Sequence, residues 1–161
     1  MSNDSRRALR EKGLKIRTEV LGEKYVDAAL NNRNKFNGSL QDLLNEFCWG
    51  DCWGGNGLTR KERSLVNLAM LTALGRTHEV VVHTRGAKNN GLNNEQIAAV
   101  FLQAAVYCGV PAAVDSFRAA NPVIAEWEAE QKAHKNKKKG GKKSGKKKTD
   151  TKQAAAKPET E

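Results

Sequence analysis

The chain has 161 residues and a formal net charge of +10, which suits one domain and raises the question of a nucleic-acid partner. The charge is uneven, because residues 131–161 carry 12 lysines and three acidic residues, which leaves the first 130 residues with a net charge of only +1. A nearly neutral body argues against a dedicated nucleic-acid-binding domain. Three cysteines without scaffold spacing, no signal peptide and no run of about 20 apolar residues predict a cytoplasmic protein, or a nuclear one given the lysines, and no membrane association.

The lysine-rich tail, residues 131–161, is expected to be disordered. It contains no Leu, Ile, Val, Phe, Tyr, Trp or Met, so no apolar burial offsets the roughly 1–2 kcal/mol per residue that ordering a backbone costs. Its lysines can contact nucleic-acid phosphates non-specifically, although it lacks the interleaved aromatic or arginine residues of base recognition. We expect residues 1–130 to form the domain that carries the function.

Residues 1–130 show the apolar spacing of helices, with apolar side chains recurring at three- and four-residue steps and no alternating strand pattern. Thr59 with Glu62 has the spacing of a capping box, and Asn93 with Gln96 opens a later helix in the same way. Pro122 predicts a break or kink. The predicted class is all-α with six or seven helices, over residues 9–20, 25–30, 39–47, 59–74, 77–90, 93–108 and from 110 onward.

The segment Glu46–Trp53 is unusual for helical scaffolding, because it holds two tryptophans, two carboxylates and two cysteines within eight residues. A glycine-rich stretch, Gly54–Gly57, follows it. Tryptophan supplies a flat apolar wall with one N–H donor, which suits a small-molecule pocket. Trp49 and Trp53 are therefore candidate pocket walls, and the alternative is that both are core anchors at a helix end.

A second unusual segment contains His78, Glu79 and His83. Glu79 and His83 are i,i+4 neighbours on one helix face, and a carboxylate beside an imidazole orients it and raises its pKa, as acid–base chemistry near neutral pH requires. The alternative is an ordinary surface pair. His78 and His83 differ by about 140° around a helix, and no second cluster of ligands completes a zinc site. We therefore expect no bound metal.

Six segments follow one another in a recognisable order: Gly13–Gly22, Glu46–Leu58, Arg63–Leu65, Ala73–Gly91, Glu95–Gln103 and Val106–Ala113. Together they resemble the 4-carboxymuconolactone decarboxylase family over roughly residues 10–122. The resemblance implies an all-helical, alkylhydroperoxidase-D-like fold that assembles into homo-trimers or homo-hexamers. It also implies decarboxylation of a small lactone carboxylate, 4-carboxymuconolactone, to 3-oxoadipate enol-lactone in protocatechuate breakdown (the β-ketoadipate pathway), with no metal or organic cofactor.

That reaction needs a cation for the retained carboxylate, donors for a developing oxyanion and an acid that returns a proton to carbon. A dry apolar wall beside the departing carboxylate would also help, because the charge disperses as the bond breaks. The candidates are His83 (proton donor or oxyanion partner, oriented by Glu79), His78 (second donor), Arg63 and Arg85 (carboxylate clamps), Trp49 and Trp53 (apolar wall), and Glu46 and Asp51 (proton relay).

Two positions depart from the family's pattern. Asp51 stands where many relatives have glutamate, and Gly55-Asn56 where many have an arginine–proline pair. A shorter carboxylate and a looser loop would reshape the pocket, so family membership is better defined than the substrate.

An alternative within the same superfamily is a thiol peroxidase of the alkylhydroperoxidase D type. That chemistry needs a Cys-x-x-Cys pair placed four residues before a histidine, and the matching positions before His83 hold Arg76 and Glu79. Cys48 and Cys52 form a CxxxC pair elsewhere. We expect these two cysteines to be structural or pocket-lining.

Overall fold

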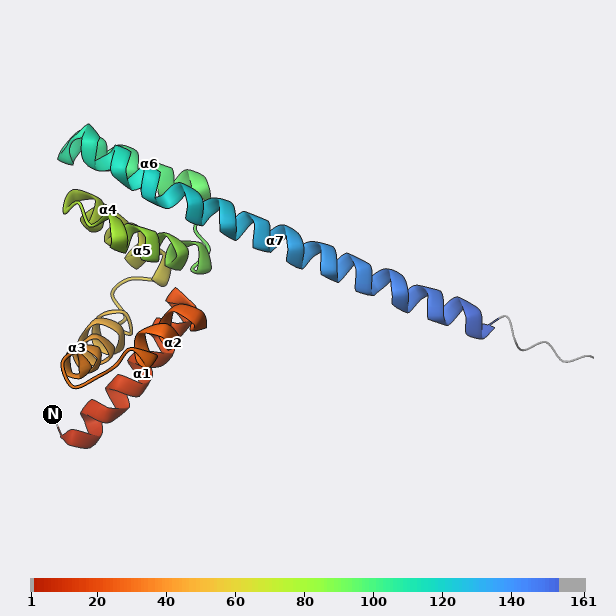
Figure 1. Ribbon diagram of the computed structural model, residues 1–161, viewed down its shortest axis with the longest axis horizontal. Coiled ribbons are helices and arrows are strands. Elements are labelled where there is room, and N and C mark those ends of the chain that lie inside the picture. The colour runs from red at the N-terminus through yellow and green to blue at the C-terminus, as the bar shows by residue number, and fades with distance from the viewer. Residues whose placement is uncertain (1, 154–161) are drawn as a thin grey trace, which may run out of the picture. The chain divides into compact units, whose positions relative to one another are not determined.

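The computed structural model describes the backbone of residues 2–153 and the side chains of residues 2–136. This part of the chain is helical and contains no strand, which confirms the predicted all-α class (Figure 1). Within it, no helix is long and apolar enough to span a bilayer. The helices are α1 (Asn3–Leu21), α2 (Glu23–Asn31), α3 (Gly38–Leu43), the π-helix η1 (Leu44–Cys52), α4 (Arg60–Ala73), α5 (Thr77–Asn89), α6 (Asn94–Cys108) and α7 (Val110–Gln153).

The helix boundaries follow from local chemistry. The Thr59 side chain accepts a hydrogen bond from the Glu62 N–H at the start of α4, while Glu62 accepts one from the Thr59 N–H at 2.7 Å, and an equivalent box opens α6. Gly22 (φ 90°) and Gly109 (φ 100°) are each the single residue between two helices. Both have a left-handed backbone that residues with a Cβ rarely adopt, so these turns depend on glycine.

The region predicted as one helix over 39–47 is α3 followed by the π-helix η1. Its wider turn is closed by i→i+5 bonds, such as the one from the Trp53 N–H to the Cys48 carbonyl at 2.9 Å. η1 packs most extensively on α1. A Cβ at Gly13 would overlap the carbonyl oxygen of Asn45, and one at Gly50 would overlap that of Leu9. The two backbones are therefore in direct contact.

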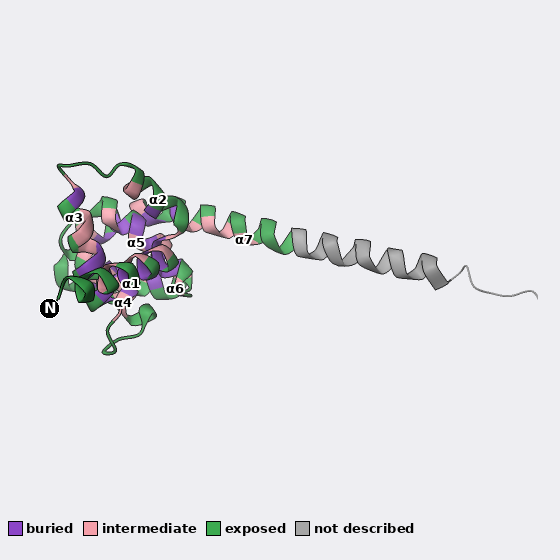
Figure 2. Ribbon diagram, turned by 90° about the horizontal axis from the view of Figure 1, so that it is seen from below, coloured by how far each residue is buried: buried purple, intermediate pink, exposed green. Residues whose placement is uncertain are grey.

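The buried residues lie inside the helical body (Figure 2). They form two apolar clusters, and among the described residues α5 is the only helix that contributes to both. Val82 belongs to the first cluster, whereas Val80 and Ala87 belong to the second. Because α5 is buried on several sides, the side chains between these positions are placed by the core. The first cluster consists of Ile16, Val20, Leu21, Val26, Trp49, Trp53 and Val82, and the second of Leu68, Val80, Ala87, Leu92, Ile97, Phe101 and Ala120.

The break predicted at Pro122 is wrong, because α7 continues through it. Proline removes one backbone hydrogen bond, to the carbonyl of residue 118. Arg118 and Pro122 are both exposed, so water can satisfy the carbonyl that is released.

The chain divides into two units, residues 1–124 and 125–161, and α7 contributes to each. The helix α7 runs to Gln153, and the disorder of residues 131–161 stays a prediction. Residues 154–161 of the predicted tail lie outside the described residues.

Candidate active site

His83 lies beside the two tryptophans of η1. Its ring centroid is 6.3 Å from each of the Trp49 and Trp53 rings, with interplanar angles of 7° and 23°. The centroids of the two tryptophan rings are 4.8 Å apart. Trp49 is only 5% exposed and Trp53 only 8%. They are four residues apart, one in η1 and the other at its C-cap, and both rings stack on His83 of α5. The tryptophans are therefore core anchors that also stack beside an imidazole, and their role as a pocket wall stays a prediction.

Asn67 of α4 fixes the direction of the His83 ring. Its Nδ2 lies 3.4 Å from His83 Nδ1. An amide nitrogen can only donate, so Nδ1 accepts and a neutral ring carries its proton on Nε2. Burial lowers the pKa of His83, and the Glu79 carboxylate opposes this by raising it. Burial is the larger effect, so the ring is neutral at pH 7 and presents an Nε2–H donor.

Glu79 and His78 differ in their relation to this ring. Glu79 is half-buried and acts on His83 through its charge, whereas the hydrogen bond to the ring comes from Asn67 rather than from Glu79. His78 is exposed in the first turn of α5. At about 140° around the helix from His83, it faces away from the tryptophans.

The structure does not bring the two predicted relay carboxylates to His83. Glu46 is 5% exposed, and its oxygens lie 3.6 Å from Arg6 Nε and 3.7 Å from Arg10 Nε. These two arginines of α1 neutralise it on the α1 side of η1. Asp51 is exposed near the end of η1. Neither carboxylate has a described contact with the His83 ring.

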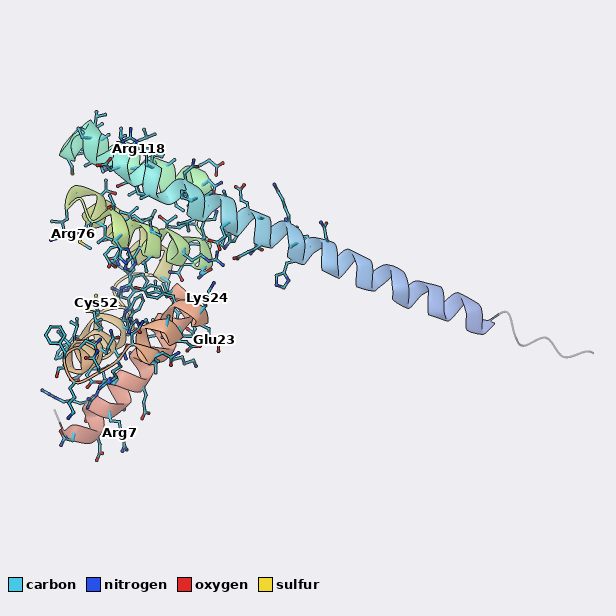
Figure 3. The ribbon with its side chains drawn as sticks, viewed as in Figure 1. Arg7, Glu23, Lys24, Cys52, Arg76 and Arg118 are labelled. Carbon is cyan, nitrogen blue, oxygen red and sulfur yellow. The ribbon has the colours of Figure 1, made fainter. Side chains whose placement is uncertain are left out.

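The two arginines predicted as carboxylate clamps lie on α4 and α5. Arg63 of α4 donates to the Gly55 carbonyl at 3.1 Å and lies 3.7 Å from Cys52 Sγ. Cys52, labelled in Figure 3, stands at the end of η1, so Arg63 ties the glycine-rich loop to that end. Arg85 is half-buried on α5, two residues and about 200° beyond His83.

Arg17 of α1 is a functional candidate that the motif reasoning passed over. It is 4% exposed, and its Nη1 donates to Gln41 Oε1 at 2.8 Å and Asn45 Oδ1 at 3.3 Å. Burial lowers the pKa of this guanidinium, which Tyr25 and Cys48 partly offset. The available signal was an arginine at a core-facing position, because Gly13, Ile16 and Val20 on the same helix face are buried.

The comparisons with known proteins place this geometry in a family. Residues 39–122, which contain η1, Asn67 and His83, match the carboxymuconolactone decarboxylase family. A 4-carboxymuconolactone decarboxylase from Acinetobacter baylyi is 40% identical over 124 residues, which are 77% of this chain and 91% of that protein. The chain belongs to the carboxymuconolactone decarboxylase family.

A second relative broadens the chemistry of the carboxymuconolactone decarboxylase family. The nitrosuccinic acid decarboxylase of Metarhizium robertsii is 40% identical over 115 residues, which are 71% of this chain and 80% of that protein. Both relatives are named as decarboxylases, which supports a decarboxylase function for this member of the family.

Proposed function

We propose that the chain decarboxylates 4-carboxymuconolactone to 3-oxoadipate enol-lactone without a cofactor. The observation that carries the proposal is the neutral His83 ring, held by Asn67 with its Nε2–H donor beside two tryptophans. The similarity to the Acinetobacter enzyme over 91% of its length supports the choice of substrate. Breakdown of aromatic acids is the pathway in which this step belongs.

The proposed mechanism places His83 at the oxygen that gains charge. The bond from the ring carbon to the departing carboxylate breaks, carbon dioxide leaves, and the electron pair passes through the ring double bond to the lactone carbonyl. A hydrogen bond from Nε2–H stabilises the resulting oxyanion. The neutral ring keeps its Nε2 proton as the hydrogen-bond donor, and the proton that completes the reaction at carbon is taken from solvent. His83 is thus an oxyanion partner rather than the acid.

The test is to incubate the protein with 4-carboxymuconolactone alone and to measure released carbon dioxide by mass spectrometry. We expect turnover by the wild type and a loss of at least about 100-fold in kcat for His83→Ala, the scale for removal of one oxyanion donor. His78→Ala is the matched control and keeps its turnover, because His78 faces away from the tryptophans. Equal rates for the wild type and His83→Ala would overturn the role given to His83.

Nitrosuccinic acid is a second candidate substrate, because the relative that decarboxylates it is also 40% identical. The chemistry is parallel: carbon dioxide leaves the carbon that bears the nitro group, and the electron pair moves onto the nitro oxygens. The same Nε2–H would serve that oxyanion. Comparing kcat/KM for the two acids under identical conditions decides between them, and we expect the lactone to be the better substrate.

The thiol peroxidase alternative fits the cysteines poorly. Burial, together with the neighbouring Cys52, raises the pKa of Cys48, and a raised pKa lowers the fraction of reactive thiolate. All three cysteines are free thiols. We expect no consumption of hydrogen peroxide beyond that of the Cys52→Ser variant, measured with an excess of dithiothreitol.

Nucleic-acid binding by the tail is the remaining alternative, and a truncation of the tail distinguishes it from catalysis. The hydrogen bond and ring contacts given for His83 are made by Asn67, Trp49 and Trp53, which all belong to the first unit. Removal of residues 135–161 should leave decarboxylation unchanged, and it should abolish any retention on heparin or duplex DNA at low salt. A truncated protein without turnover would favour a tail-dependent function.

A further inference from the structure

Arg17 presents an unsatisfied edge of its guanidinium inside the first unit. Both of its hydrogen bonds leave from Nη1, to the side-chain oxygens of Gln41 and Asn45. Nε–H and one N–H of Nη2 form the other edge, which is the pair of parallel donors that grips a carboxylate. Nε is buried and has no hydrogen-bond partner among the described residues. The edge best suited to a carboxylate is therefore vacant.

The positive charge of Arg17 is also uncompensated. Among the described residues, no carboxylate oxygen lies within 4.0 Å of its guanidinium nitrogens, although the exposed Arg33 pairs with Asp42 at 2.9 Å. Gln41 and Asn45 offer dipoles rather than charge. Burial of a cation without a counter-charge is unfavourable. A bound carboxylate would supply the missing charge together with two acceptors.

The position of Arg17 connects it to His83. Its sequence neighbour Ile16 and the His83 neighbour Val82 pack in the same apolar cluster, together with Trp49 and Trp53. Tyr25 interacts electrostatically with Arg17 and with Glu79. Glu79 interacts in turn with His83. Arg17 and His83 are therefore linked both through neighbours in this cluster and through the Tyr25 and Glu79 charges.

We propose that Arg17 binds the carboxylate that the substrate keeps, while His83 donates a hydrogen bond to the oxygen that gains negative charge. The inference rests on the proposed function, because both substrates considered there are dicarboxylates that lose one carboxylate and retain the other. Arg63 also has a buried Nε without a described partner, but it is less suited to this task, because Cys52 Sγ and the Gly55 carbonyl already engage both of its terminal nitrogens. Arg17 is thus a binding residue that discriminates dicarboxylates from monocarboxylates.

The test uses succinate as a dicarboxylate probe and its uncharged diamide, succinamide, as the matched ligand. The melting temperature of the full-length protein is measured against each ligand at constant ionic strength, so that the tail contributes equally. We expect succinate, and not succinamide, to raise the melting temperature of the wild type and of Arg33→Lys, the control at an exposed ion pair. Arg17→Lys and Arg17→Gln should bind succinate at least about tenfold more weakly, because neither offers the bidentate edge.

Three results would overturn the proposal: no response of the wild type to succinate, an unaltered response of Arg17→Gln, or failure of both Arg17 variants to fold. The last would assign Arg17 to the framework. Turnover separates this proposal from the proposed function. If the wild type ignores 4-carboxymuconolactone while succinate binding still requires Arg17, the substrate assignment fails and the carboxylate site stands. If the wild type turns it over and Arg17→Lys has an unchanged KM, the carboxylate site fails and the function stands.

Discussion

At the scale of single residues, the chemistry depends on which state of His83 the fold favours. A charged imidazolium would lose its hydration beside Trp49 and Trp53, which are almost fully buried. It would also present an N–H from Nδ1 to the Asn67 amide nitrogen, which is itself a donor. Both effects select the neutral ring. An oxyanion donor of this kind is already oriented before substrate arrives, so it requires no reorganisation during the reaction.

The lowered pKa of His83 predicts a loss of stability in mild acid. The unfolded chain binds a proton at His83 near the ordinary pKa of 6.5, and the folded chain binds it only at lower pH. The unfolded state therefore holds more protons in that window, so stability is complete above pH 6.5 and falls as the pH drops toward the folded pKa. One such group contributes at most about 1.4 kcal/mol per pH unit.

Thermal melting of the wild type and of His83→Gln between pH 5 and 8 measures this effect. We expect the wild type to lose stability below pH 6.5 more steeply than the variant. Parallel curves would show that the imidazole is not desolvated. The carboxylates are common to both proteins, so their titration cancels in the difference.

Replacing Asn67 with aspartate should reverse the tautomer of His83. A carboxylate at this position can only accept, so it draws the proton to Nδ1 and leaves Nε2 bare. We expect kcat to fall by about 100-fold, the scale for one lost oxyanion donor, with a small change in KM. Steady-state kinetics at pH 7.5 measure both constants. Asn121→Asp makes the same charge change on the exposed face of α7 and should leave both constants unaltered.

The sequence predicted the parts of the site that are rare residue types. Trp49, Trp53 and His83 attract attention on composition alone, and the structure brings them together. Asn67 and Arg17 could not be predicted this way, because their contacts join positions 16, 24 and 28 residues apart on different helices. Common residue types acquire such roles only through tertiary packing.

At the scale of elements, the contact between α1 and η1 holds the tryptophans in place. A methyl group at Gly13 would meet the backbone carbonyl of Asn45, which cannot rotate away as a side chain can. Gly13→Ala should therefore destabilise the fold by roughly 3 kcal/mol, the upper end of the cost of overpacking. Urea denaturation followed by tryptophan fluorescence measures the change. Gly57→Ala is the control, because a Cβ there has open space, and an equal loss in both variants would contradict the close contact.

Helix boundaries were more predictable than helix type. The capping boxes at Thr59 and Asn93 are local hydrogen-bond patterns that a sequence states directly. The π-helix was not predicted, because its apolar spacing resembles that of an α-helix and its widened turn depends on the fit against Gly13. Glu46 was predicted to lie near His83 for the same reason. The π-helical register of η1, which decides which side chains face α1, was not predicted.

At the scale of the whole molecule, an apolar surface on α4, α6 and the start of α7 remains uncovered. An open groove of about 410 Å³ runs between α4 and α6, and Val66 and Tyr107 are among its lining residues. Val106 and Tyr107 are 80% and 81% exposed. Large exposed apolar patches of this kind mark association surfaces. We propose that copies of the chain cover this surface in a homo-oligomer.

Light scattering after size exclusion tests this assembly. The wild type should elute as a trimer or hexamer, and Val106→Lys should shift it toward the 17.7 kDa monomer, because a buried unpaired lysine is unfavourable. Phe36→Lys is the matched control, since Phe36 is 97% exposed in the loop between α2 and α3, which are not among the helices that form this surface. A monomeric wild type would refute the proposal.

Membership of α5 in both apolar clusters has a consequence for inactivation by heat. The helix that carries His83 has no independent support, since melting of either cluster removes packing from one of its faces. A partly unfolded state in which the His83 site stays intact is therefore not expected. Activity and tertiary structure should disappear at one midpoint, and recovery of turnover after cooling should report refolding of the entire first unit.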